Sequence, residues 1–246
     1  MNRQSPACPI ALLLTFILFL SNAHAQKDAT TSSGATPPST AEGVGRKGNE
    51  PEKRVTDAAA VVRRMKSDAR VSDLIQGAKG LLIVPHFIKA ALVFGGQGGA
   101  GLLVVQKNGR WSDPAFYKTR SGSFGAQIGG AKGALVMIFT SDAAVEAFAV
   151  KTTSWSLNAG AGLTTASYSK DTPQSGTLSD VVVWSDTSGL FGGAAVGATR
   201  VARDEDANQA YYDHTDVTPQ EILSGLVANP YSNSLREVLP MQLAAK

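Results

Sequence analysis

The chain has 246 residues, of which 43% are hydrophobic and 17% are charged, a composition that allows one sizeable domain with a real core and a tail. Its formal net charge of +3 is too small to indicate, by itself, a nucleic-acid or membrane partner. The only cysteine, Cys8, lies before the first apolar segment. The folded part therefore has no disulfide. A lipid-modified cysteine would follow the apolar segment, so the position of Cys8 before this segment does not fit one.

The N-terminus has the pattern of a secretory signal peptide. Arg3 precedes the apolar run Ile10–Leu20, and a small-x-small pattern ends at Ala25. The apolar run has 11 residues, whereas a membrane-spanning helix needs about 20. We therefore expect residues 1–25 to be a cleaved signal peptide rather than an uncleaved anchor, and the mature protein to be exported.

Residues 26–53 are predicted to form a disordered linker. Val44 is the only large apolar residue in this segment, so the segment cannot bury enough surface to offset the entropy lost on ordering. The folded domain is expected to span residues 54–240.

The segment Arg54–Ile75 has the spacing of an amphipathic helix. The apolar positions recur every three or four residues, at Val55, Ala58, Ala59, Val62, Met65 and Ala69. One flank of this stripe carries Arg63, Lys66 and Arg70, and the other carries acidic residues, Asp57 among them. Two interpretations remain open. The helix lies on a sheet with a solvated charged face, or it lies at a membrane surface with its basic flank on anionic headgroups.

A curled antiparallel sheet is expected after this helix. The runs Leu81–Val84, Ala90–Phe94 and Leu102–Gln106 each have the length of a strand and are divided by glycine and proline. Asn108 and Gly109 both accept a positive φ, which favours a tight hairpin turn between two strands. Five later runs are also typical of strands: Ala115–Lys118, Phe124–Gly129, Ala134–Phe139, Trp155–Ala161 and Val181–Trp184.

Short helices are predicted at three places. Ser141 and Asp142 favour a cap and a first turn. Thr218, Pro219 and Glu221 form a capping box with proline at the first helical position. One or two further helical turns are expected between Ser234 and Leu239. The fold class is therefore α+β: a mostly antiparallel curled or barrel-like sheet, an N-terminal amphipathic helix and short C-terminal helices.

Catalytic and cofactor motifs are weak. Gly96, Gly98 and Gly101 match GxGxxG, but the following residues are typical of a strand, whereas dinucleotide binding needs a helix there. His86 and His214 have no cysteine with which to form a zinc site, and the acidic run 204–206 is expected to be a solvated loop. We expect no cofactor, no metal and no enzymatic activity. A hydrolase that uses the polar run 213–216 is the remote alternative.

Ordered landmarks along the chain resemble a known family. They are Ala78-Lys79-Gly80 with Ile83 and Pro85; Gly95-Gly96 with Gly99 and Gly101; Trp111-Ser112 with Pro114 and Phe116; Gly125, Gln127 and Gly129; Ser185, Ser188-Gly189-Leu190-Phe191 and Gly193; Asn208 and Tyr211-Tyr212; and Ile222-Leu223-Ser224-Gly225. Each is weak alone, but together, over about Arg54 to Leu226, they resemble the SYLF domain, a lipid-binding domain also known as an actin-regulator family. The chain departs from the family pattern at residues 159–162 and at Asp213, where the family often has glycine.

The resemblance implies non-enzymatic binding of an acidic phospholipid, phosphoinositide-type in the family, by a peripherally membrane-associated domain. The headgroup contacts are expected from Arg63, Lys66 and Arg70, with Arg64 on the opposite side of the helix and with Lys79 and Lys89 extending the patch. An exported protein, periplasmic or secreted, would not meet cytosolic actin, so actin is not an expected partner, nor is nucleic acid. A structural module that binds a cell-envelope protein, or its own copy, is the second hypothesis.

Overall fold

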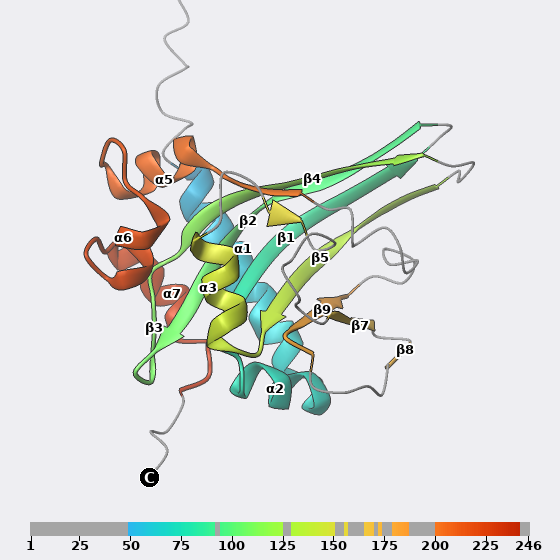
Figure 1. The fold of residues 1–246 in the computed structure, drawn as a ribbon, viewed down its shortest axis with the longest axis horizontal. Helices are drawn as coiled ribbons and strands as arrows, with labels where there is room; N and C mark the ends of the chain where they lie inside the picture. Colours follow the sequence, from blue (N-terminus) through green and yellow to red (C-terminus); the bar gives the residue numbers. More distant parts are fainter. Residues whose placement is uncertain are drawn as a thin grey trace, which may run out of the picture. The chain divides into compact units, whose positions relative to one another are not determined.

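The computed structural model describes residues 49–91, 94–124, 129–150, 155–156, 165–169, 172–173, 179–186 and 200–241 (Figure 1). The helices are α1 (Asn49–Lys66), α2 (Ala69–Gln76), α3 (Asp142–Val150), α5 (Glu205–Tyr212), α6 (Pro219–Ser224), the short 3₁₀ helix η2 (Pro230–Ser232) and α7 (Asn233–Arg236). The strands are β1 (Gly80–Ala91), β2 (Phe94–Lys107), β3 (Arg110–Trp111), β4 (Ala115–Phe124), β5 (Gly129–Phe139), β6 (Trp155–Ser156), β7 (Thr165–Ser169), β8 (Thr172–Pro173), β9 (Val181–Ser185) and β10 (Arg200–Arg203). The predicted signal peptide and most of the predicted linker lie outside the described residues.

The strands form one ten-stranded sheet in the order β6-β10-β4-β2-β1-β5-β9-β7-β8, with β3 paired to β2. All described pairs are antiparallel except β7 with β9. The order runs from β6 to β8 without a pairing between these two ends, so among the described strands the sheet is curled but open. The predicted α+β class is confirmed, in its open-sheet form.

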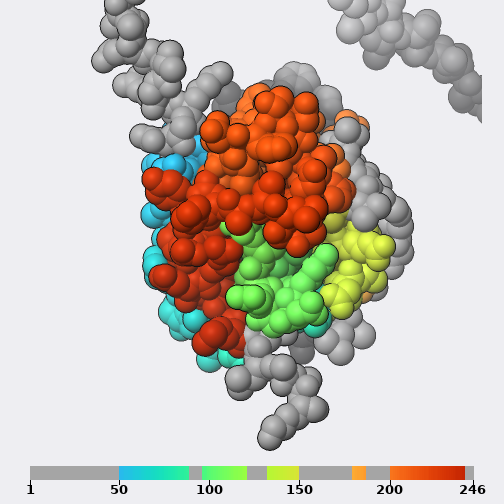
Figure 2. All heavy atoms as spheres, turned by 90° about the vertical axis from the view of Figure 1, so that its left-hand side faces the viewer, coloured from blue at the N-terminus to red at the C-terminus, as the bar shows by residue number. Residues whose placement is uncertain are grey.

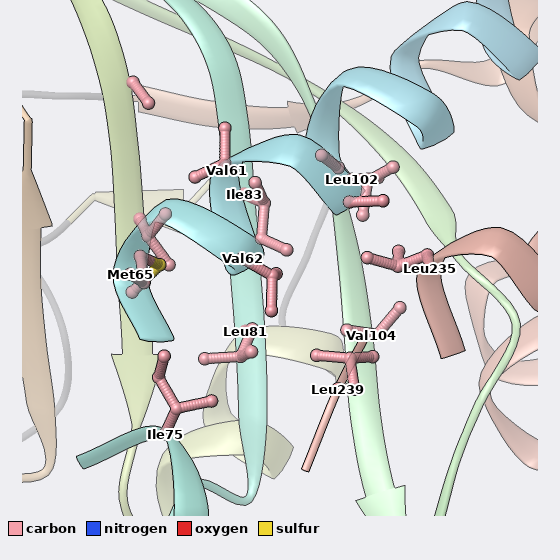
Figure 3. Packing of buried hydrophobic residues seen from close by; sticks show 14 of the residues in the cluster. Val61, Val62, Met65, Ile75, Leu81, Ile83, Leu102, Val104, Leu235 and Leu239 are labelled. Carbon is pink, nitrogen blue, oxygen red and sulfur yellow. The ribbon is translucent and has the colours of Figure 1, made fainter. Parts of the chain in front are cut away.

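Both faces of the central strands are buried, which explains their continuous apolar runs. Leu81 and Ile83 point to one face and pack against α1, α2 and α7, as Figure 3 shows. Leu82 and Val84 point to the other face, where α3 and α6 lie. In Figure 1, α1 and α3 accordingly lie on opposite sides of the sheet. The domain thus has three layers, and α1 belongs to the core.

The strand β1 is continuous, whereas the sequence predicted a break at Pro85. The pairing register shifts between Ile83 and Ile88 on the β2 side and between Val84 and Phe87 on the β5 side. This is a β-bulge, one of the few places where a central strand tolerates the missing N–H of proline. The expected strand Leu81–Val84 is therefore part of one bent strand that continues to Ala91. The expected strand Ala90–Phe94 is wrong as a unit, because Ala90 and Ala91 end β1 and Phe94 begins β2.

The glycines of the GxGxxG match lie in the strand β2, and no helix begins there. Two of the three, Gly98 and Gly101, allow close packing between strands, whereas a Cβ at Gly96 would meet nothing within 4 Å. A Cβ at Gly98 would overlap the carbonyl oxygen of Thr119, and one at Gly101 would lie 2.6 Å from that of Ile83. These two glycines therefore let the neighbouring strands approach β2 closely.

The hairpin turn is confirmed. Asn108 has φ 51° and Gly109 has φ 76°, the positive values that a type I′ turn requires. The turn joins Lys107 of β2 directly to its partner Arg110 of β3.

The predicted single helix over Arg54–Ile75 is wrong in two respects. It is two helices, because Asp68 leaves the helical conformation and caps α2 by accepting a hydrogen bond from the Arg70 amide at 3.1 Å. The first helix also begins at Asn49, inside the predicted linker. Pro51, which favours the first turn of a helix, and the acidic residues of that turn explain the earlier start. Among the described residues, no helix has the length and apolar character needed to cross a membrane.

The C-terminal part follows its local signals. Ser141 caps α3 by accepting from the Ala144 amide at 3.2 Å, and the predicted capping box at Thr218 and Glu221 is present. Asp213 ends α5 with φ 48°. Glycine adopts this left-handed conformation most readily, and aspartate is among the few other residues that tolerate it.

Candidate functional site

Arg63 and Lys66 are the predicted lipid-contact residues that the structure leaves most available. They lie three residues apart on α1, so their side chains are neighbours on the helix surface, and both are exposed. Arg63 has no hydrogen-bond or ion-pair partner within the described part of the chain. Lys66 donates one hydrogen bond from Nζ to the carbonyl oxygen of Val238 at 3.1 Å, which leaves two of its three N–H groups for a ligand.

The other predicted contacts are not gathered beside them. Arg64 lies on the opposite flank of α1 and pairs with Asp186 at 3.1 Å. Arg70 lies in α2, beyond the helix break, and its Nε is 3.4 Å from the Asp68 carboxylate. Lys79 is half-buried just before β1. Lys89 lies in β1, but its side chain is outside the described residues. The continuous basic ridge that the sequence predicted is therefore reduced to the pair Arg63 and Lys66, with Arg70 on the next helix.

The apolar stripe of α1 is not available to a membrane. Val55, Val62 and Met65 are no more than 1% exposed and belong to the core between the helix and the sheet. Figure 3 shows Val62 and Met65 pointing toward the strands. Of the two interpretations of this helix, the structure supports the one in which it lies on the sheet. Insertion of the stripe into lipid would require α1 to leave the core.

A charged cluster that the sequence did not indicate lies at the start of α5. Asp204, expected in a solvated loop, is only 2% exposed. It caps α5 through the Ala207 amide at 3.3 Å and pairs with Arg54 at 3.0 Å and with Lys118 at 2.7 Å. Arg54 also lies over the ring of Phe116, 5.4 Å from its centroid. The expectation of a solvated acidic loop is thus wrong for Asp204, which ties α1, β4 and α5 together.

Several family landmarks have structural roles. Asn208 binds both the amide and the carbonyl of Phe116, at 2.8 and 3.1 Å, and so fixes α5 to β4. Tyr212 donates to the carbonyl of Pro114 at 2.9 Å. Trp111 donates from Nε1 to the carbonyl of Pro240 at 2.8 Å. These three landmarks therefore connect α5 to the β4 region and β3 to the C-terminal segment of the domain.

His86 and His214 are the two histidines that the structure describes. The described residues include no group of three or more His, Cys, Asp or Glu that could hold a metal ion. His86 lies 3.0 Å from the Asp57 carboxylate, to which Lys53 also donates at 2.6 Å. Burial raises the pKa of Asp57, but these two hydrogen bonds outweigh it and hold that pKa below its usual value. His214 is exposed in the turn after α5.

The sequence matches the model of the Ysc84 family, described as "Las17-binding protein actin regulator", over residues 120–242, which is half of the chain. It is 32% identical over 163 residues to an SH3 domain-containing protein of Schizosaccharomyces pombe, covering 64% of this chain and 37% of the relative. It is 30% identical over 162 residues to Protein YSC84 of Saccharomyces cerevisiae, covering 64% and 34%. It is also 30% identical over 173 residues to human SH3 domain-containing YSC84-like protein 1, covering 68% and 49%.

These matches cover between a third and half of the length of the relatives. No solved structure matches the chain. The order of landmarks and the family match agree. A further relative, from Saccharomyces cerevisiae, is named LAS seventeen-binding protein 3. This chain belongs to the Ysc84 family, the actin-regulator family of the SYLF domain.

Proposed function

We propose that this domain binds the surface of an anionic phospholipid membrane through Arg63 and Lys66 of α1, with Arg70 at the start of α2, and that it catalyses no reaction. The observation that carries this proposal is the position of Arg63. It is a fully cationic side chain on an exposed helix flank, without an acidic partner among the described residues, and beside a second exposed cation.

The buried stripe of α1 determines the mode of binding. Because the apolar residues of the helix pack on the sheet, the contact is electrostatic and peripheral. A basic residue near an anionic membrane contributes about 1 kcal/mol. Two or three such residues therefore give weak binding that decreases as salt screens the charges.

The setting of this binding rests on the predicted signal peptide. An exported protein meets the outer face of a membrane or the periplasm, and it does not meet cytosolic actin. For that reason we do not extend to this chain the actin-related or Las17-related binding that the descriptions of the family and its relatives print.

Co-sedimentation with vesicles tests the proposal. The mature chain is mixed with vesicles of phosphatidylcholine alone and with vesicles that also contain an acidic phospholipid, at low and at high salt. We expect binding to the acidic vesicles only, and less of it at high salt. Equal binding to both vesicle types, or binding to neither, would refute the proposal. Self-association that persists at high salt without vesicle binding would instead favour the protein-interaction module.

A further inference from the structure

The β2–β3 hairpin carries two cations in an unfavourable arrangement. Lys107 and Arg110 are direct cross-strand partners on either side of the Asn108-Gly109 turn, and both are exposed. Like charges directly opposite each other destabilise a strand pair. Neither side chain has an acidic partner in the part of the chain that the structure describes. This pair therefore does not stabilise the fold.

Both cations line a groove that lies apart from the flank of α1. The groove has a volume of about 680 Å³ and lies between the hairpin, the segment 111–113, the end of α6 and the helix α7. Figure 2 faces this side of the domain, with the hairpin in green next to the C-terminal helices in orange and red. The volume is within the range of sites for small ligands, about 300–1,000 Å³.

The charge of the groove is positive. Its basic lining residues are Lys107, Arg110 and Arg236, and Asp113 is the one carboxylate among the described residues that line it. Asp113 is 4% exposed. It accepts from Arg236 at 2.8 Å and from the amide of Asn229 at 3.2 Å. Arg236 neutralises the negative charge of Asp113, so the positive charges of Lys107 and Arg110 remain uncompensated in the groove. A cleft lined by positive charge attracts anionic ligands.

The walls of the groove are held in place by contacts that do not involve this cationic pair. Arg236 is fixed from two sides, by Asp113 and by Asn233, whose Oδ1 accepts at 2.7 Å. Trp111 is anchored by its bond to the Pro240 carbonyl. The amide of Gly225, at the end of α6, donates to the carbonyl oxygen of Ile222 at 3.0 Å. The groove is therefore preorganised, which lowers the cost of binding.

We infer that this groove is a binding site for a phosphate-bearing ligand, held by Lys107 and Arg110 through charge-assisted hydrogen bonds. The side-chain amides of Asn108 and Asn233, which also line the groove, can donate further hydrogen bonds to such a ligand. The phosphate can be that of a free small molecule or that of a lipid headgroup. The site is distinct from the α1 surface of the proposed function and does not depend on it.

The test uses the mature chain with inositol hexakisphosphate as a soluble probe and isothermal titration calorimetry as the readout. The double variant Lys107→Gln/Arg110→Gln removes the cationic pair. Arg120→Gln/Arg200→Gln removes the same charge from another exposed cross-strand pair, which does not line the groove, as a matched control. We expect the hairpin variant to bind the probe at least about tenfold more weakly than the parent, and the control variant to bind it as the parent does. We also expect the melting temperature of the hairpin variant to be unchanged or higher, because a repulsive pair is removed.

A second arm distinguishes the two sources of phosphate. Both variants are sedimented with phosphatidylcholine vesicles that contain phosphatidylinositol monophosphate. If the hairpin variant loses binding to these vesicles as well, the groove takes a lipid headgroup; if it loses only the soluble probe, the groove takes a free phosphate ligand. The inference is overturned if the parent does not bind the probe, if the hairpin variant binds it as tightly as the parent, or if the control variant loses as much affinity. The proposed function is tested separately with Arg63→Gln/Lys66→Gln: binding of this variant to acidic vesicles at the level of the parent contradicts the proposed function and leaves the groove untouched.

Discussion

Replacement of Asp204 by alanine should destabilise the domain strongly, although the residue lies in a run of three acidic residues that looks solvated. Three contributions are lost. The cap of α5 is worth about 1 kcal/mol. The partly buried pair with Arg54, whose side chain is 15% exposed, leaves that cation unpaired at a cost of about 3 kcal/mol. The pair with Lys118, which is 40% exposed, adds less than about 1 kcal/mol.

The sum is about 4 kcal/mol, a large part of the 5–15 kcal/mol that typically stabilises a domain. Urea unfolding followed by circular dichroism would measure it, and the melting temperature should fall by about 10 °C. Asp206→Ala is the matched control. Asp206 is 94% exposed and lies 3.9 Å from Lys118, so its loss should cost less than about 0.5 kcal/mol. If Asp204→Ala cost no more than its neighbour, the buried cluster would not hold α1, β4 and α5 together.

Three further predictions concern stability. Asn208→Ala should cost about 3 kcal/mol in urea unfolding, because the buried amide and carbonyl of Phe116 lose their partner; a cost under about 1 kcal/mol would contradict the role of this side chain. Gly225→Ala should cost about 1 kcal/mol, since the left-handed φ of 83° disfavours alanine while the space around it is open; no change in the unfolding midpoint would be the contrary result. Hydrogen bonds from the backbone amide and the hydroxyl of Thr218 hold the pKa of Glu221 below its usual value, so its stabilising effect is present above the pKa of the unfolded chain and lost as pH falls through the lowered pKa. The free energy of unfolding, measured as a function of pH, should therefore fall less steeply in acid for Glu221→Gln than for the parent. The same decrease with falling pH in both proteins would refute this.

Local chemistry was enough to predict some elements of this fold. The hairpin at Asn108-Gly109 and the capping box at Thr218 depend on residues that are close in sequence, and both formed as expected. The continuous apolar run of β5 likewise predicted a central strand, because a strand that is buried on both faces has apolar side chains at successive positions and not at every second one.

Tertiary context decided the rest. The bulge at Pro85 depends on how β1 pairs with two neighbours at once. The break before α2 depends on Asp68, which caps the new helix. The spacing of the apolar residues continues across this break and therefore did not indicate it. The periodicity of α1 correctly placed Arg63 on an exposed flank. It could not show that Arg64 meets Asp186, 122 positions later in the chain, nor that Asp204 becomes buried between three segments.

The most direct measurement of membrane binding compares the parent with Arg63→Gln/Lys66→Gln/Arg70→Gln by flotation with acidic vesicles. The removed residues are exposed and contribute about 1 kcal/mol each, so we expect the variant to lose most of its vesicle binding while its melting temperature stays close to that of the parent. A folded variant that floats with acidic vesicles as well as the parent does would contradict the proposal that this domain meets a membrane through α1 and α2.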